Sequence, residues 1–280
     1  MSKNIISGLS GALLSLAIFT FVYFFVDQKY IDKFLPRNRN EAIIYFPVLI
    51  IAPITAILIH ESGHLLMGLY LGQKFKLFVV AFLGIKDEDG KTKFFFNKNP
   101  AYFGGVAATA PLTESDINPK SFAKILLAGP IFSFLFFIGC ALVFLQFDSA
   151  YNSFFALTAL ISFGLFLATT IPEKTGLMFT DRKRFQRLCT IGVTQDVEIA
   201  LYELLSKSII DNSFRNIDIS KTLILEKDND VTIKFWTYYL RFMFYKENGL
   251  DEMRENSLQQ LYKIQHEIPK SIWNALISSK

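Results

Sequence analysis

The chain has 280 residues, of which 51% are hydrophobic and 15% are aromatic, with 30 Phe among them. This is more apolar material than a soluble domain of this size needs for its core, so the composition predicts a polytopic α-helical membrane protein. The net charge is only +4 and the basic residues are spread along the chain, so neither a nucleic-acid groove nor an acidic partner is implied.

The first predicted span covers residues 5–26, a stretch without charge that is long enough to cross about 30 Å of hydrocarbon as a helix. Its apolar part is too long for the core of a signal peptide and no small-residue cleavage site follows it, so we expect it to stay uncleaved. A charged linker follows at residues 27–41. The second span starts near residue 42 and contains Pro47 and Pro53, which a membrane accommodates because neighbouring helices re-satisfy the freed backbone groups.

A strand pattern follows the second span. Residues 75–85 are rich in Phe, Val and Leu, Asp89-Gly90 is a hairpin-turn signal, and residues 92–97 supply the returning strand. We therefore expect a β-hairpin directly after the second span. Residues 102–119 form a predicted loop, and its Gly104-Gly105 pair indicates close backbone approach or a tight turn. The pattern is compatible with a plain connector and with a loop that lines a site.

Two further spans are predicted at residues 125–147 and 154–172, followed by an irregular segment at residues 173–180. Gly129, near the start of the third span, removes bulk where two helices could meet closely. Eight lysines lie between residues 74 and 124, and arginines follow the fourth span. The positive-inside rule therefore predicts that both termini and the hairpin are cytoplasmic, although the linker between the first two spans also carries basic residues.

The last part of the chain is polar and helical, and we expect residues 191–280 to form a small cytoplasmic helical domain. Apolar residues recur at helical spacing on three faces, which consist of Val197, Leu201, Leu204 and Leu205, of Ile233, Trp236, Tyr239, Leu240 and Met243, and of Leu250, Met253, Leu258, Leu261 and Ile264. Asp230 and Pro269 are predicted helix starts. The predicted organisation is thus a first span with its linker at residues 1–41, a membrane core at residues 42–190, and this domain.

Residues 60–64 read His-Glu-Ser-Gly-His at the end of the second span, and two of the chain's three histidines fall in this frame. Residues four apart on an α-helix are separated by about 40° around the axis and about 6 Å along it, so His60 and His64 project from one face. This is the geometry of a two-histidine zinc site, with Glu61 placed as a general base. Ionisable groups in a membrane are costly and usually functional, which favours a metal site over ordinary histidines at a membrane boundary. The third histidine, His266, is predicted to lie on the surface of the C-terminal domain.

A catalytic zinc normally takes three protein ligands and leaves one position for water. Since no other histidine lies near the membrane, the third ligand is expected to be a carboxylate. By the predicted topology, Asp148 falls on the opposite side of the bilayer from His60. Glu173 and Asp181, at the end of the fourth span, remain as the alternatives on the correct side.

Together these features resemble the site-2 protease family of zinc intramembrane metalloproteases. The resemblance is carried by the His-Glu-Ser-Gly-His motif in a span, by the hairpin after it, by the Ala-Gly-Pro sequence at residues 128–130, and by a proline and then an aspartate beyond the last span. It covers about residues 42–190, which would then be the intramembrane metalloprotease core.

The resemblance also implies the third ligand. In that family it is an Asp in a segment that begins Asn-x-x-Pro and ends several residues later in Asp-Gly. Pro172 matches the proline, so the resemblance implies Asp181 as the ligand that joins the two histidines. Thr169 stands where the family has Asn and offers a hydroxyl in place of an amide. Arg182 stands where the family has Gly and restricts the backbone beside the ligand.

The activity that the resemblance implies is hydrolysis of peptide bonds within or beside the membrane, with Zn²⁺ as cofactor and Glu61 as the catalytic base. The implied substrate is a transmembrane protein or peptide, such as a single-span regulator or a signal-peptide remnant, and the implied location is the cell membrane, as a multi-pass protein in the lipid bilayer. A non-catalytic membrane scaffold that keeps the family fold is the main alternative, favoured by Thr169 and Arg182 and opposed by the intact motif. A transporter is a weaker alternative, because the spans hold few charged residues to line an ion path.

Overall fold

The computed structural model describes residues 26–88, 90–98, 102–172, 174–175, 178–268 and 270–274. All but the last residue of the predicted first span, residues 5–26, lie outside the described part of the chain, as do Glu173 and Pro269. These predictions therefore stay predictions.

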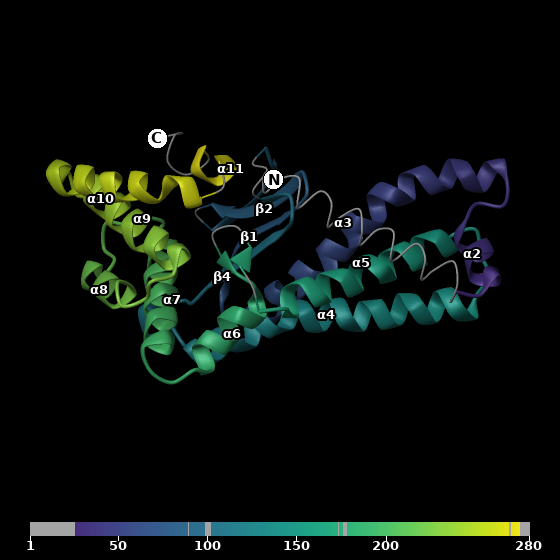
Figure 1. Ribbon diagram of the computed structural model, residues 1–280, viewed down its shortest axis with the longest axis horizontal. Coiled ribbons are helices and arrows are strands. Elements are labelled where there is room, and N and C mark those ends of the chain that lie inside the picture. Colours follow the sequence, from purple (N-terminus) through teal and green to yellow (C-terminus); the bar gives the residue numbers. More distant parts are fainter. Residues whose placement is uncertain are drawn as a thin grey trace, which may run out of the picture.

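Three helices in the described part of the chain are long and apolar enough to cross a membrane. They are α3 (Arg39–Tyr70), α4 (Pro119–Gln146) and α5 (Asn152–Thr170), and each packs against the other two (Figure 1). The predicted second, third and fourth spans are thus confirmed as membrane-length helices. The Asn38 side chain caps α3 by accepting the backbone N–H of Glu41. A short helix, α2 (Gln28–Phe34), lies at the end of the bundle where α3 begins.

A four-stranded antiparallel sheet replaces the predicted hairpin. Its strands are β1 (Lys74–Val80), β2 (Leu83–Glu88), β3 (Lys91–Phe96) and β4 (Val106–Ala110), arranged in the order β3-β2-β1-β4. The reversal near Asp89-Gly90 was predicted correctly, since Glu88 pairs with Lys91 across it. The edge strands of the sheet are therefore β3 and β4, and each pairs with one neighbouring strand of the described structure.

The prediction of one strand over residues 75–85 was wrong, because the chain reverses at Ala81 and Phe82. Ala81 has a φ of +52°, a conformation that alanine rarely adopts, so no turn residue announces this reversal. The turn is held from outside by Asn97, whose side chain donates to the Ala81 carbonyl at 2.8 Å and whose backbone N–H donates to the Phe82 carbonyl at 2.8 Å. A contact over such a sequence distance leaves no local signal.

The predicted loop at residues 102–119 also contains regular structure, namely β4 and the 3₁₀ turn η2 (Glu114–Asp116). The segment expected to be irregular after α5 contains two short paired strands, β5 (Lys174–Thr175) and β6 (Met178–Phe179). Small residues dominate β4, and its strand conformation comes from pairing with β1. Such pairing is a tertiary effect that overrides weak local preference.

The C-terminal region is helical, as predicted. It comprises α6 (Asp181–Cys189), α7 (Val193–Asp211), η3 (Ile219–Lys221), α8 (Thr222–Leu225), α9 (Val231–Glu247), α10 (Asp251–Ile264), η4 (Gln265–Glu267) and α11 (Lys270–Trp273). Asp230 caps α9 as expected, by accepting the backbone N–H of Thr232. The sheet and these helices lie together at the end of the bundle opposite α2 (Figure 1).

The predicted faces of these helices form the core of the region, with two residues as exceptions. Buried side chains include Val197, Leu201, Leu204, Ile233, Tyr239, Leu240, Met243 and Leu261. Leu250 and Met253 are exposed instead, because they lie at the N-terminal end of α10. His266 is on the surface as predicted, with 77% of its side chain exposed.

Candidate metal centre

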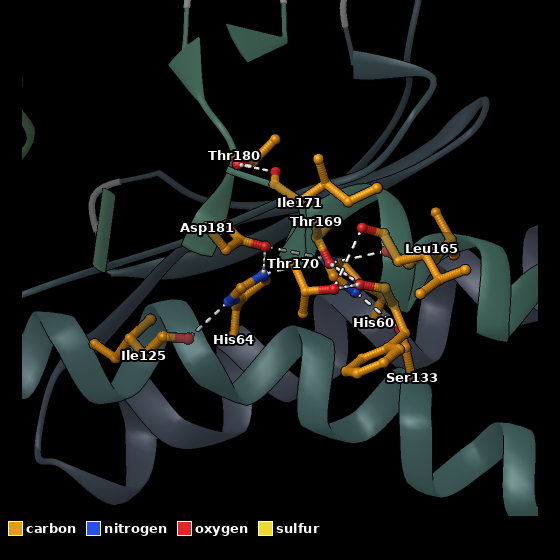
Figure 2. Close-up of polar contacts among 12 residues, drawn as sticks. His60, His64, Ile125, Ser133, Leu165, Thr169, Thr170, Ile171, Thr180 and Asp181 are labelled. Carbon is orange, nitrogen blue, oxygen red and sulfur yellow. Dashed lines mark hydrogen bonds and ion pairs between the residues drawn. The ribbon is translucent and has the colours of Figure 1, made fainter. Parts of the chain in front are cut away.

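Two imidazoles at the C-terminal half of α3 form the base of the site. His60 is buried and His64 is half-buried, and their Nε2 atoms lie 3.3 Å apart. The four-residue spacing places both rings on one face of the helix, as the sequence predicts. Figure 2 shows the two rings directed toward the same point from neighbouring turns of α3.

The third group comes from a distant part of the chain. Asp181 is the first residue of α6, and its Oδ2 atom lies 3.5 Å from Nε2 of His60 and 3.4 Å from Nε2 of His64 (Figure 2). The residue before it, Thr180, donates its hydroxyl to the Ile171 carbonyl at 2.9 Å, which ties the start of α6 to the end of α5. The structure thus brings Asp181 to the two histidines.

The spacing of these three donor atoms suits a tetrahedral ion. Two ligand atoms that are each about 2.1 Å from a zinc ion and about 109° apart lie about 3.4 Å from one another. The three measured separations are 3.3, 3.4 and 3.5 Å. His60, His64 and Asp181 also form the one group of metal-ligand type found among the described residues. The donor set therefore fits the zinc that the motif predicts.

Helix α4 orients both imidazoles through their other nitrogen. Nδ1 of His64 lies 2.7 Å from the Ile125 carbonyl, and Nδ1 of His60 lies 2.9 Å from the hydroxyl of the buried Ser133. A carbonyl only accepts, so Nδ1 of His64 carries the proton and Nε2 keeps its lone pair for a ligand. The sequence analysis missed Ser133, although a serine in an apolar span was an available signal.

Two glycines allow α3 and α4 to approach this closely. A Cβ atom on Gly129 would lie 2.2 Å from Nε2 of His64, and one on Gly63 would lie 2.6 Å from the Ala128 carbonyl oxygen. No side chain fits at either position without displacing its neighbours. The expected close approach of two helices at Gly129 is confirmed.

The predicted base, Glu61, is buried and faces the loop that precedes β4. Gly105 lies against its carboxylate, since a Cβ atom there would be 2.7 Å from Oε1, and the backbone of Ala107 interacts with the same carboxylate. Gly105 also has a φ of +96°, which favours glycine. The loop at residues 102–119 therefore lines the site and is not a plain connector.

The electrostatic surroundings favour an ionised Asp181. Burial raises the pKa of this carboxyl group, but its interactions with the adjacent His60 and His64 together outweigh burial, so the pKa lies well below its ordinary value. The position at the first turn of α6 acts in the same direction, because a helix N-terminus favours negative charge. A half-buried carboxylate with two imidazoles is an arrangement that attracts a divalent cation.

The other sequence candidates lie elsewhere. Asp148 pairs with Arg37 at the end of the bundle where α3 begins, far along the helix from His60. The Thr169 hydroxyl donates to the Leu165 carbonyl of its own helix at 2.8 Å (Figure 2), so it does not replace the amide that the family has there. Arg182 stacks over the Phe185 ring at 5.4 Å.

Helix α6 is attached to α7 and to the segment before α9 by ion pairs that the sequence analysis did not find. Glu198 of α7, with 0% of its side chain exposed, accepts from Nε of Arg184 at 2.7 Å and from Nε of Arg187 at 3.0 Å. Arg187 also pairs with Asp228 at 2.8 Å. Helix α6 is therefore held against α7 at Arg184 and Arg187, which follow Asp181 by about one and two helical turns.

The fold and the site together define a class, that of integral membrane proteins with a candidate His-His-Asp metal centre. The comparisons with known proteins agree. A family model described as Peptidase family M50 matches residues 48–276, and the chain belongs to this family, whose members are zinc intramembrane metalloproteases of the site-2 protease type. The match continues well past the expected boundary near residue 190 into the C-terminal helices. Neither a curated protein nor a solved structure matches the chain.

Proposed function

We propose that this protein is a zinc-dependent endopeptidase that cuts peptide bonds of membrane-embedded substrates. The observation that carries the proposal is the convergence of His60, His64 and Asp181 next to Glu61, at the end of an apolar helix of membrane length. Membership of the M50 family supplies the reaction class, since it implies peptide substrates.

His60, His64 and Asp181 are the residues that would hold the zinc ion. Zinc bound there would act as a Lewis acid that makes water more acidic and polarises the scissile carbonyl. The chain supplies the orientation, because the Ile125 carbonyl and the Ser133 hydroxyl hold both imidazoles with Nε2 toward the ion.

Glu61 is the proposed general base. Its carboxylate takes a proton from water as the water oxygen forms a bond to the scissile carbonyl carbon. It then delivers this proton to the amide nitrogen as the carbon–nitrogen bond breaks, so that the amine leaves neutral. The backbone at Gly105 and Ala107 keeps the carboxylate in place during both transfers.

The proposed substrate is a single-span protein, such as a membrane-bound regulator or a signal-peptide remnant. A transmembrane helix hides its carbonyls in hydrogen bonds, so the substrate must unwind before it is cut. The edge strand β4 follows Gly105 and lies beside Glu61, where it offers backbone groups to an unwound segment by strand addition.

The proposed location is the cell membrane, with the metal centre near the cytoplasmic face. The basic residues between α3 and α4 and those of α6 lie at the metal end of the bundle, and the positive-inside rule assigns that end to the cytoplasm. Both termini are then cytoplasmic.

The test replaces Glu61 with Gln in the purified full chain. We expect cleavage of single-span model polypeptides to fall at least about a hundredfold while the zinc content stays unchanged, because only the base is removed. Glu203→Gln, on α7, is the matched control. Unchanged cleavage by Glu61→Gln would remove the proposed base. A wild-type protein that holds zinc and cuts none of the polypeptides would point to the scaffold alternative.

A further inference from the structure

A cavity of about 210 Å³ is lined in part by His64. Its walls come from the end of α3, from β4, from the start of α4, from α6 and from α7. The C-terminal helix α7 closes the cavity on one side with Tyr202, Leu205, Ser206 and Ile209. Part of the C-terminal region is thus a wall of a cavity that reaches His64 of the candidate metal centre.

The polar groups of the walls are already engaged with one another. The Thr109 hydroxyl donates to the Gln73 side-chain oxygen at 2.6 Å, the Gln73 amide donates to the Tyr202 hydroxyl at 3.4 Å, and Arg184 pairs with Glu198. The remaining lining is apolar and includes Leu65, Ala108, Phe122, Met178 and Leu205. A polar guest would lose its water without gaining partners, whereas an apolar guest gains by burial.

The size of the cavity limits the guest further. Sites for whole drug-sized ligands usually enclose about 300–1,000 Å³, so this cavity suits one medium or large side chain rather than a free small molecule. It lies beside β4, the strand to which an unwound substrate would add, and side chains of an added strand point alternately to either side. One substrate side chain near the cut bond can therefore enter it.

We infer that this cavity is the subsite for an apolar side chain of the peptide substrate next to the scissile bond, and that α7 sets the size of side chain it accepts. The inference rests on the proposed peptidase function. It assigns the C-terminal helices a direct part in substrate selection, with Leu205 as the specificity-determining residue at the wall.

The first test measures cleavage by the zinc-loaded full chain. Its substrates are single-span model polypeptides with Ala, Leu, Phe or Trp placed in turn at each position of the span, and products are identified by mass spectrometry. We expect cut sites to carry Leu or Phe at one fixed position. Leu205→Trp fills the cavity and should lower kcat/KM for these sites at least about tenfold, while sites with Ala stay within about twofold.

The matched control is Leu223→Trp, an exposed position on α8 outside the cavity, which should leave the size preference unchanged. Cut sites that show no size preference at any position would overturn the subsite while leaving the peptidase function intact. An equal loss for all substrates in Leu205→Trp, at unchanged zinc content, would overturn it as well.

The second test detects binding without turnover, in a Glu61→Gln Cys189→Ser background that keeps only the buried Cys140. The variant Ser206→Cys, whose cysteine lies in the cavity wall, is oxidised with a series of model polypeptides. Each polypeptide carries a single cysteine at a different position of its span. We expect Ser206→Cys to form a disulfide with the polypeptide at only one or two adjacent cysteine positions. Adding Leu205→Trp should abolish this disulfide. The control, Lys221→Cys, should show no such dependence on the cysteine position. If Ser206→Cys crosslinks in this background while the zinc-loaded chain with Glu61 intact cuts none of the polypeptides, the peptidase is refuted and the site is kept. Absence of any crosslink from Ser206→Cys would overturn the site.

Discussion

The short helix α6 carries two buried charged clusters of opposite character. The first cluster consists of Asp181, the first residue of the helix, and the imidazoles of His60 and His64. When both imidazoles are neutral, this cluster carries one negative charge. No Lys or Arg side chain of the described structure lies within ion-pair distance of Asp181 to balance it. Further along the helix, Arg184 and Arg187 meet Glu198 and Asp228, so two positive charges face two negative ones.

This difference separates a binding site from a structural one. Burying a charge is costly unless it is paired, and the second cluster pairs its charges within the fold. The first cluster lacks balancing positive charge and offers two imidazole lone pairs. A divalent cation would supply the positive charge and accept the lone pairs. Burial and proximity are common to both clusters, and only the charge balance distinguishes them.

The largest expected effect comes from removing a ligand of the unbalanced cluster. His64→Ala should weaken zinc binding by more than about a hundredfold, because a three-ligand site becomes a two-ligand site. Chelator competition on the purified protein measures this affinity. His266→Ala, which changes the exposed histidine of the C-terminal region, should bind zinc like the wild type. Equal zinc affinity in His64→Ala and the wild type would break the comparison.

Opening the balanced cluster should lower stability rather than remove a ligand. Glu198→Gln leaves the Arg184 and Arg187 guanidinium groups short of one buried charge, and breaking such a pair costs about 3–5 kcal/mol. The thermal unfolding of the solubilised protein reports this loss. The control, Glu203→Gln, opens the more exposed pair with Lys221 and should cost at most about 1 kcal/mol. Similar unfolding temperatures for both variants would show that the buried cluster has no special weight.

A methyl group at Gly129 tests how tightly the fold holds the unbalanced cluster. Gly129→Ala places a Cβ atom 2.2 Å from Nε2 of His64. Because the Ile125 carbonyl holds the other side of this ring, the ring must turn away from its position. We expect zinc affinity to fall about 10–100-fold, as for loss of an orienting contact. Gly139→Ala, on the same helix with no atom near its added Cβ, should leave the affinity unchanged. Parallel behaviour of the two variants would contradict the close contact.

A methyl group at Gly105 addresses the base instead of the ligands. Gly105→Ala adds a Cβ atom 2.7 Å from Oε1 of Glu61 and strains a backbone with a φ of +96°. Peptide hydrolysis should fall about tenfold through kcat, since displacing a general base costs part of its contribution, with zinc affinity retained. Gly104→Ala has open space and should hydrolyse peptides normally. A loss of zinc affinity in Gly105→Ala would contradict this expectation, because it would show that the loop supports the metal ligands rather than Glu61.

The smallest effect concerns a third, exposed pair at the far end of the bundle. The Arg37 guanidinium lowers the pKa of Asp148, so the folded state favours the ionised carboxylate. Its stabilisation is complete above the ordinary pKa of about 4 and is lost as the pH falls through the lowered pKa. Unfolding temperatures of the wild type and Asp148→Asn should therefore differ slightly at pH 7 and converge in acid. A difference that grows in acid would refute this sign.

Some of this architecture was predictable because its signals are local. Continuous apolar stretches predict the three membrane-length helices, and the four-residue spacing of His60 and His64 predicts that their rings share a face. The turn at Ala81 was not predictable, because Asn97 holds it from a later strand. The partner of Ser133 was not predictable either, because His60 lies 73 residues away in the sequence.

The sequence by itself determined the three membrane-length helices and the shared face of His60 and His64, because hydropathy and helix periodicity act over a few turns of one segment. Only the tertiary structure decided which carboxylate lies beside the imidazoles, that β4 is an edge strand next to Glu61, and that α7 closes a cavity at His64. These arrangements depend on contacts between segments that are far apart along the chain, and such contacts become favourable only when packing in three dimensions offsets the entropy of bringing the segments together.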